Sequence, residues 1–568
     1  MFSSLPKTAV DFMNWDWSQI KPYFDDLSSR ALTSSSVMEW LSDWSRIREL
    51  VEEARWRHYV ALTLDTTDVE AGERYHDCLE QIITPTEKAD QDLKLKLLSS
   101  GLEPEGFEVQ VRNIRAQADL YREVNLPLLV EGHRLAAEYD KIIGAQTIEW
   151  EGAELTLQQL RPILKDPERE KRERAWRLAA TRQLDDREAI NSLWVQLLEV
   201  RRQLAENAQL LDYRAYRWRE LLRFDYTPED CIQFHMAIED VVVPAATRIC
   251  VRRKERLNLK LLCPWDVFVD PLSRDPLKPF AKTEELESKA SAIFHRVDPQ
   301  LGSYFDNMRQ EGLLDLDNRK GKAPGGYCVM FHAARIPFIF MNAVGLHDDV
   351  QTMLHEAGHA FHVFFKAGQL PYYHQMNTPT EFNEVGSMAM ELLAAPYLAE
   401  SEGGFYTPKA AARARIEHLE GNILFWPYMA VVDAFQHWVY ENIEAAAEPG
   451  NCDKRWSELW KRFKPDVDWS GLEQEMMTGW HRKLHLYHEP FYYVEYGLAQ
   501  LGAVQVWKNA LQDQAQAVKQ YKQALAKGGT LPLPELYQTA GARFSFDADT
   551  LSEAVSLMEL TINELEAI

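Results

Sequence analysis

The sequence predicts a mostly α-helical protein with a small β-sheet placed directly before one well-punctuated helix. Charged runs rich in Leu and Ala, such as 166–207 and 409–420, carry Glu and Arg or Lys three and four positions apart, as exposed helix faces do. The apolar run at 336–341 follows a Gly-Gly pair and predicts a short strand. With 568 residues, of which 46% are hydrophobic, the chain can bury a core in two or more lobes.

Two interruptions of the helical pattern organise the chain. Residues 147–156 alternate around Glu151-Gly152, which predicts a small β-hairpin. Four prolines between residues 263 and 280 predict an extended loop. We expect a helical N-terminal lobe at 1–195, which contains the hairpin, and a larger lobe at 196–568, although no flexible linker marks the boundary.

Charge and cysteine content exclude several classes of function. The chain carries 63 basic and 87 acidic residues, a formal net charge of -24, which disfavours nucleic acid and anionic membranes as partners. The six cysteines include no C-x-x-C pair and are too sparse for a disulfide framework, so we expect a reducing compartment. The N-terminus shows no apolar signal segment, and no run of about 18 apolar residues is present to span a membrane. We therefore expect a cytoplasmic protein.

One helix carries the most informative motif. Asp348 or Asp349 can cap its start, and Gly368 can end it. Within this helix His355 and His359 are four residues apart, so their side chains lie about 40° apart on one face. Two imidazoles placed in this way can bind one zinc ion at about 2.0–2.1 Å.

Glu356 directly follows the first histidine and completes an HExxH motif. It is offset from His355 by about 100° around the helix, so it can address a water molecule on the metal without being a ligand. HExxH alone is a weak signal, because two histidines on an ordinary helix give the same pattern. A catalytic zinc also needs a third protein ligand and leaves a fourth position for water.

His362 lies on the same helix face but is a poor third ligand. It is seven residues beyond His355, which is about 10.5 Å along the axis, whereas two ligand atoms on one zinc lie within about 3.5 Å of each other. We expect His362 to have a structural role beside the site. The metzincin pattern HExxHxxGxxH also fails, because His362 occupies its glycine position and Phe365 that of its third histidine.

The next helix offers the third ligand. Thr378 and Glu381 have the spacing of a capping box, with Pro379 at the first helical position. Glu384 and Glu391 lie seven residues apart and share a face, so one acid can reach the zinc while the other supports the site. An exposed helix face explains this pair taken alone, but two acids on an otherwise apolar helix beside HExxH favour a metal site.

At these residues the sequence resembles the thimet oligopeptidase and oligoendopeptidase F family of zinc metallopeptidases. That family has HExGHAxH and, 29 residues after the first histidine, the glutamate of F-x-E-x-x-S-x-x-x-E. Here residues 355–362 are HEAGHAFH and residues 382–391 are FNEVGSMAME. The resemblance runs from about residue 265 through 321–328 to 485–507 and is strongest to the bacterial oligoendopeptidase F branch. The N-terminal third matches only loosely, through the hairpin.

The resemblance implies a two-lobed helical shell of the gluzincin type around a deep channel, with one zinc ion per chain on the channel floor. His355, His359 and Glu384 would bind the zinc, and Glu391 and His362 would support them. The lobe at 196–568 would be the zinc peptidase lobe. The implied reaction is hydrolysis of internal bonds in short unstructured peptides, by a zinc-activated water with Glu356 as general base.

A third segment, residues 485–496, resembles the family pattern H-x-[FY]-x-x-P-F-Y-Y-x-x-Y. Pro490 can open a helix on which Tyr493 and Tyr496 share a face. Phenol hydroxyls and an imidazole suit the oxyanion of a tetrahedral intermediate, although an aromatic packing stripe gives the same pattern. We expect Tyr496 and Tyr493 foremost in this role and His485 next, with Tyr492 as the alternative.

The last expectations concern the substrate and the rival functions. The strand that begins at Phe338 can offer its edge to an extended peptide, and Gly326 and Tyr327 would lie beside it in the channel. One rival is a zinc carboxypeptidase or dipeptidyl carboxypeptidase of similar helical fold. The other is a catalytically inactive peptide-binding scaffold, against which the intact HExxH motif and Glu384 argue.

Overall fold

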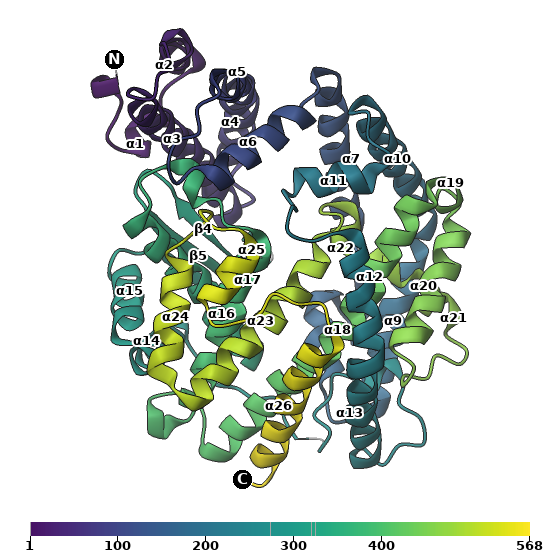
Figure 1. Ribbon diagram of the computed structural model, residues 1–568. Helices are drawn as coiled ribbons and strands as arrows, with labels where there is room; N and C mark the ends of the chain where they lie inside the picture. The colour runs from purple at the N-terminus through teal and green to yellow at the C-terminus, as the bar shows by residue number, and fades with distance from the viewer. Residues whose placement is uncertain (1, 273, 320, 324) are drawn as a thin grey trace. The chain divides into compact units, whose positions relative to one another are not determined.

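The computed structural model describes residues 2–272, 274–319, 321–323 and 325–568 (Figure 1). The proline-rich loop expected at 263–280 includes Ser273, and the motif at 321–328 includes Pro324; both residues lie outside the described ranges. Over the described residues the fold is mostly α-helical with two small sheets, as the sequence predicts. In the same part of the chain, no helix is both long enough and apolar enough to cross a bilayer.

The chain divides into two compact units, each built from three segments. Unit 1 comprises the described residues of Met1–Asp119, Lys278–Ala411 and Gly502–Phe544. Unit 2 comprises those of Leu120–Leu277, Ala412–Leu501 and Ser545–Ile568. The lobe boundary expected at residue 195 falls inside a continuous helix of unit 2, α10 (Arg187–Asn207), and the lobes at 1–195 and 196–568 stay a prediction.

Unit 1 combines a group of N-terminal helices with a three-stranded sheet and the helices that follow it. The N-terminal helices bury a shared apolar core that includes Trp40 and Trp44, and the Trp44 indole donates to Asp90 Oδ1 at 2.7 Å. The elements of unit 1 are α1 (Ala9–Phe12), α2 (Trp17–Ser29), α3 (Val37–Leu64), α4 (Val69–Cys78), α5 (Thr84–Ser100), α6 (Glu108–Leu120, whose last residue is in unit 2), α14 (Thr283–Val297), α15 (Pro299–Gln310), β3 (Leu314–Asp317), β4 (Tyr327–Phe331), β5 (Ile336–Ala343), α16 (His347–Gln369), α17 (Thr380–Ala394), α24 (Gln514–Leu525) and α25 (Leu533–Thr539).

Unit 2 is helical apart from one hairpin. Strands β1 (Thr147–Trp150) and β2 (Ala153–Thr156) pair antiparallel around Glu151 and Gly152, whose φ angles of 52° and 84° suit a two-residue turn, so the expected hairpin is confirmed. The helices of unit 2, of which α18 and α23 also extend into unit 1, are α7 (Leu126–Gly144), α8 (Arg161–Leu164), α9 (Arg169–Asp185), α10, α11 (Tyr213–Glu220), α12 (Pro228–Ala237), α13 (Val243–Arg256), α18 (Pro408–Glu441), α19 (Ile443–Ala446), α20 (Pro449–Phe463), α21 (Glu473–Met477), α22 (Leu484–Tyr487), α23 (Tyr493–Gln512) and α26 (Ala548–Glu566).

The sheet of unit 1 has the strand order β3-β5-β4, with β3 parallel and β4 antiparallel to β5. β5 is the central strand, and its Phe338 pairs with Val329 of β4. The expectation that this strand offers its edge to a peptide is therefore wrong, because β3 occupies one side of it and β4 the other. β4 forms an edge of the sheet and takes over as the candidate peptide-binding strand.

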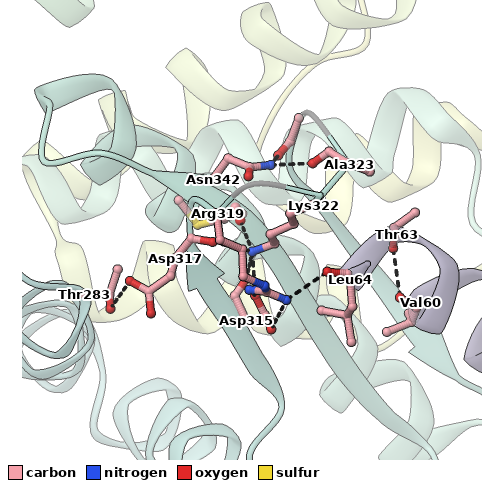
Figure 2. A network of polar contacts seen from close by, with 12 residues as sticks. Val60, Thr63, Leu64, Thr283, Asp315, Asp317, Arg319, Lys322, Ala323 and Asn342 are labelled. Carbon is pink, nitrogen blue, oxygen red and sulfur yellow. Dashed lines mark hydrogen bonds and ion pairs between the residues drawn. The ribbon is translucent and has the colours of Figure 1, made fainter. Parts of the chain in front are cut away.

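A buried lysine fixes the connection between β3 and β4 (Figure 2). Lys322 Nζ donates to Asp315 Oδ1 at 2.5 Å and to the carbonyl oxygen of the same residue at 3.1 Å. It also donates to the carbonyl of Asp317 at 2.9 Å and to that of Met341. Burial lowers the pKa of Lys322, and the Asp315 carboxylate opposes this shift. The ammonium group thus collects acceptors from both β3 and β5.

Asn342, near the end of β5, holds the second half of the same connection (Figure 2). Its Nδ2 donates to the carbonyl oxygens of Ala323 and Gly325 at 2.7 and 2.9 Å. Gly326 follows directly, and Tyr327 is the first residue of β4. The polar network therefore sets where β4 begins.

β5 leads into α16, the helix with the HExxH motif, through one tight turn. Gly345 makes this turn with a φ of 90°, where a Cβ would come within 2.9 Å of a backbone oxygen. Asp349 Oδ2 accepts from the N–H groups of Val344 and Leu346 at 2.9 and 2.8 Å. Of the two acids expected to cap this helix, Asp349 makes these bonds at its start.

The far end of α16 differs from the expectation. Gly368 lies inside the helix, and the C-cap is Leu370, with φ -102° and ψ 120°. Pro371 comes next, and a proline disfavours the helical conformation of the residue before it. The stop therefore comes from the proline and not from the glycine.

Two other helices begin later than the sequence predicts. Pro379 is the N-cap of α17 and not its first helical residue, so the predicted capping box, which needs Thr378 as the N-cap, is wrong. α23 begins at Tyr493 and not at Pro490, because Phe491 has a φ of 66° and cannot belong to a helix. Tyr493 and Tyr496 still lie one turn apart, in the first turn of α23.

Candidate metal centre

Helices α16 and α17 meet backbone to backbone at Gly358. A Cβ on this residue would lie 2.6 Å from Ser387 Cα and 2.8 Å from the carbonyl oxygen of Gly386. Any larger residue would therefore force the two helices apart. The close approach brings Glu384, one turn before Ser387, to the two histidines of the HExxH motif.

Three side chains converge at this helix contact as possible metal ligands. Glu384 Oε2 lies 3.3 Å from His355 Nε2 and 3.6 Å from His359 Nε2, and one ligand atom from each residue lies within 4.8 Å of the other two. Ligand atoms bound to one tetrahedral zinc at about 2.1 Å lie about 3.4 Å apart, so the arrangement fits this ion. The histidine side chains are 23% and 22% exposed, which leaves an accessible side for a water molecule or a substrate.

Neighbouring polar groups orient two of these ligands. Glu391 Oε1 lies 2.7 Å from His355 Nδ1, a hydrogen bond that orients the ring with Nε2 toward Glu384. Ser387 Oγ donates to Glu384 Oε2 at 3.0 Å. Glu391 thus lies beside the candidate ligands, and its expected supporting role stays a prediction. Ser387 was not singled out from the sequence, although its spacing of three residues from Glu384 on one helix was a usable signal.

The electrostatics of the group suit a cation. Burial alone would raise the pKa of Glu384, but the neighbouring His359 and His355 have the larger effect and lower it to about 2. The carboxylate is therefore ionised. Burial lowers the pKa of His355, and Glu384 and Glu391 outweigh this effect and raise it well above its ordinary value. Burial lowers the pKa of His359 to about 4, so its imidazole is neutral. The two acids thus favour a positive charge at His355, and a bound divalent ion would supply that charge in place of the proton.

Glu356 lies beside the ligands and has a different environment from Glu384. Burial raises its pKa to about 7, and the nearby Glu384 and Glu391 add to this shift while His355 opposes it. Its Oε2 is buried and has no hydrogen-bond partner among the described residues. Buried polar atoms are nearly always paired, so this oxygen is placed for a group that binds there. A water molecule or a substrate amine is such a group.

The expected substrate residues of unit 1 divide into two kinds. Gly326 lies next to Glu356, because a Cβ on it would be 3.8 Å from Glu356 Oε1 and 3.4 Å from the carbonyl oxygen of Phe340. Tyr327 stacks on Phe340 at 4.7 Å between ring centroids, and its hydroxyl lies 2.5 Å from Thr63 Oγ1. The structure thus places Gly326 beside Glu356, whereas the hydroxyl of Tyr327 is hydrogen-bonded to Thr63.

Phe338 is a core residue of the sheet. Its side chain is buried, and its ring packs on Phe331 of the neighbouring strand at 5.9 Å. The structure gives it no accessible surface for a peptide, so its expected place in the substrate site is not supported.

His362 is not one of the three side chains that converge as candidate ligands, and its expected supporting role stays a prediction. It is buried, and its Nε2 lies 3.3 Å from Thr378 Oγ1, just before α17. Burial lowers its pKa well below the ordinary value, so the ring is neutral. The side chain thus connects α16 to the residue that precedes the N-cap of α17.

The expected oxyanion residues gather in unit 2. The ring of His485 lies 5.8, 5.1 and 6.0 Å from those of Tyr492, Tyr493 and Tyr496. Lys483, which the sequence did not single out, places Nζ 3.7 Å from the centroid of the Tyr493 ring. Burial lowers the pKa of this lysine to about 7. The four expected residues therefore form one cluster, and their contact with a reacting carbonyl stays a proposal.

Replacing Gly358 by alanine should weaken zinc binding and destabilise the protein. The methyl group would push α16 from α17 and separate Glu384 from the histidines, at a cost of about 1–3 kcal/mol in unfolding free energy and about 10–100-fold in zinc affinity. Gly368→Ala is the matched control, because a Cβ there meets no atom within 4 Å. The control should stabilise the helix by up to about 1 kcal/mol. Thermal unfolding and competition with a chelator measure both effects, and equal results for the two variants would contradict the prediction.

These features define a mostly helical protein whose candidate metal centre combines an HExxH helix with a glutamate from the next helix. The chain belongs to peptidase family M3, whose model matches residues 163–556. The resemblance noted in the sequence is thereby confirmed, and it rests on most of the chain.

Three similar proteins show how far the likeness extends. An oligoendopeptidase F homolog of Borreliella burgdorferi is 24% identical over 56% of this chain and 52% of its own length. The chromosomal oligoendopeptidase F of Lactococcus lactis subsp. cremoris is 22% identical over 64% of this chain and 58% of its own. The matches thus span little more than half of these relatives. The solved structure of PZ peptidase A with an inhibitor has 27% identity and a TM-score of 0.88, and the alignment covers 99% of both chains.

Proposed function

We propose that this protein is a zinc-dependent oligoendopeptidase that hydrolyses internal bonds of short unstructured peptides. The observation that carries the proposal is the convergence of His355, His359 and Glu384 beside Glu356, whose buried Oε2 has no partner among the described residues. Membership of family M3 and the oligoendopeptidase F relatives support the same activity.

The residues of this site divide the work of hydrolysis. When bound, zinc supplies Lewis-acid activation of the attacking water and of the scissile carbonyl. Glu356 accepts the water proton and delivers it to the leaving amine, for which its unpartnered oxygen is available. Glu391 keeps His355 in the tautomer and orientation that ligation requires.

The substrate backbone would lie along β4, one of the two edge strands of the sheet. Main-chain hydrogen bonds to a strand edge hold an extended peptide without reading its side chains. Gly326, directly before β4, lets the peptide pass close to Glu356, because no side chain fills this space. The hydroxyls of Tyr496 and Tyr493 and the imidazole of His485 would receive the oxyanion, with Tyr492 as the alternative donor.

One digestion tests the activity and its closest rival. The full-length, zinc-loaded protein is incubated with a peptide library blocked at both ends, and the products are read by mass spectrometry. We expect internal cleavage, its loss on chelation and its return with added zinc. Cleavage that requires a free C-terminus would establish the carboxypeptidase rival, and binding without turnover would establish an inactive scaffold.

Substrate size gives a second test of the proposal. An extended peptide advances about 3.3 Å per residue and can thread into a recessed site that excludes a folded domain. We expect cleavage of unstructured peptides of roughly 5–20 residues and almost none of folded proteins. The comparison uses one blocked peptide, free and inserted into a stable folded host. Comparable rates on both would mean an open cleft.

A further inference from the structure

We propose that Cys231, Asp433 and His437 form a second metal site, in unit 2, that binds one zinc ion. Two helices supply its residues. Cys231 and His235 lie four residues apart on α12, and Asp433 and His437 lie four apart on α18. This spacing places each pair on one face of its helix, one turn apart, as paired ligands on a helix require.

The structure brings these side chains together in the interior of unit 2. The Sγ of Cys231, a carboxylate oxygen of Asp433 and a ring nitrogen of His437 all lie within 4.8 Å of one another. His437 Nε2 is 3.4 Å from Asp433 Oδ2, and His235 Nε2 is 2.9 Å from the same oxygen. The four side chains are buried, with Cys231 and Asp433 at 0% exposure and both histidines at 4%.

Unsatisfied atoms inside the cluster indicate a missing ligand. Asp433 Oδ1 has no hydrogen-bond partner among the described residues, and His437 Nε2 has only the long 3.4 Å contact with Asp433 Oδ2, which lacks the geometry of a hydrogen bond. Leaving polar atoms unpaired in a protein interior lowers the stability of the folded state. A purely hydrogen-bonded cluster leaves this cost in place, whereas a metal ion bound by both atoms removes it.

The donor set and its charge select the class of ion. A thiolate, a carboxylate and a neutral imidazole carry two negative charges, so a divalent ion gives a neutral buried site. Sulfur and nitrogen donors suit zinc, whereas magnesium and calcium prefer oxygen ligands alone. On binding, the Cys231 thiol loses its proton to solvent, and the proton on His437 Nε2 moves to Nδ1. His235 keeps hold of the second oxygen of Asp433, as supporting histidines and carboxylates do around metal ligands.

The contact between Arg214 and His437 allows a test of the proposal by mutation. Its guanidinium nitrogen lies 3.2 Å from His437 Nδ1 and also donates to Glu441 Oε1 at 2.5 Å. An arginine only donates, so Nδ1 accepts and Nε2 carries the proton in the metal-free protein. Metal on Nε2 transfers that proton to Nδ1 and ends the bond with Arg214. Arg214 therefore opposes metal binding, and Arg214→Gln, whose amide oxygen accepts from Nδ1–H, should tighten it by about tenfold.

Cobalt substitution of the full-length protein tests the site. Co²⁺ bound by a thiolate shows an intense near-ultraviolet charge-transfer band, which a site made of two histidines and a glutamate lacks. We expect about two cobalt ions per chain and this band in the wild-type protein. His359→Ala should keep the band and lose one ion. The proposed peptidase site and the second site are thus counted separately.

Two cysteine variants separate the site from other thiols. Cys231→Ser should lose the band and one ion while zinc-supported peptide hydrolysis is unchanged. Cys452→Ser is the matched control, because Cys452 is equally buried and its thiol donates to the carbonyl of Ala446 at 3.3 Å. The control should keep the band, and circular dichroism shows whether each variant is folded. Absence of the band from the folded wild-type protein, or unchanged affinity in Arg214→Gln, would overturn the proposal and leave a hydrogen-bonded cluster.

Discussion

Glu356→Gln should lower turnover by at least about 100-fold while the zinc content stays at the wild-type level. Glutamine has the shape of glutamate, so α16 and the neighbouring ligands keep their places. It cannot accept the proton of the attacking water, which is the step assigned to this residue. The buried environment of the carboxyl group also favours the exchange, because an amide costs less to bury than a charged carboxylate. We therefore expect a folded, metal-loaded and nearly inactive protein.

The measurement combines steady-state kinetics on one blocked peptide with metal analysis of the same samples. His359→Ala and Glu384→Ala provide the contrast, because each removes a ligand and should lose the metal of this site together with the activity. If Glu356→Gln retained near-normal turnover, the base would have to be another group. If it lost the metal, Glu356 would act as a ligand and the assignment of Glu384 would need revision.

Tyr496→Phe should lower kcat by about 10²–10³-fold with little change in KM. The substitution removes one hydroxyl and keeps the ring, which packs on Tyr492 and Tyr493 at 5.2 and 5.7 Å between centroids. A hydroxyl that meets the oxyanion acts only in the transition state, and for this reason kcat falls while substrate binding does not. The contacts of the ring preserve the cluster, so the melting temperature should change little.

Tyr492→Phe is the matched control for Tyr496. Both rings pack on His485, and each variant loses only a hydroxyl group. We expect the kinetic effect at Tyr496 alone. A drop at Tyr492 in its place would transfer the role to that residue, and an unchanged kcat with lowered stability in both variants would mean that the cluster serves packing.

The parts of the fold that depend on one element were predictable from the sequence. The spacing of His355 and His359 fixes their angle around α16 whatever surrounds the helix. Likewise, the alternation around Glu151-Gly152 is sufficient for the hairpin, because both turn residues adopt positive φ. The same geometry puts Glu384 and Glu391 on one face of the next helix, but only the resemblance to the family selected Glu384 as the candidate third ligand.

The errors arose where a second element decides the outcome. β3 gave no recognisable signal, so the sequence could not show that it pairs with β5 and covers the edge proposed for the peptide. The end of α16 was assigned to Gly368 because a glycine is a common stop, but Leu370 before Pro371 sets it. The role of Gly358 was hidden as well, because its lack of a side chain matters only against the backbone of α17.

The buried ammonium group of Lys322 has a consequence for how the start of β4 responds to solvent. Carbonyl oxygens from two strands surround it, as they surround a potassium ion in an ion-binding protein, but here the cation is covalently attached to the chain. A loop that depends on a dissociable ion is ordered only when that ion is abundant, and one held by surface ion pairs loosens as salt rises. An enclosed, tethered charge is screened far less. We therefore expect the connection between β3 and β4 to keep its shape across a wide range of ionic strength.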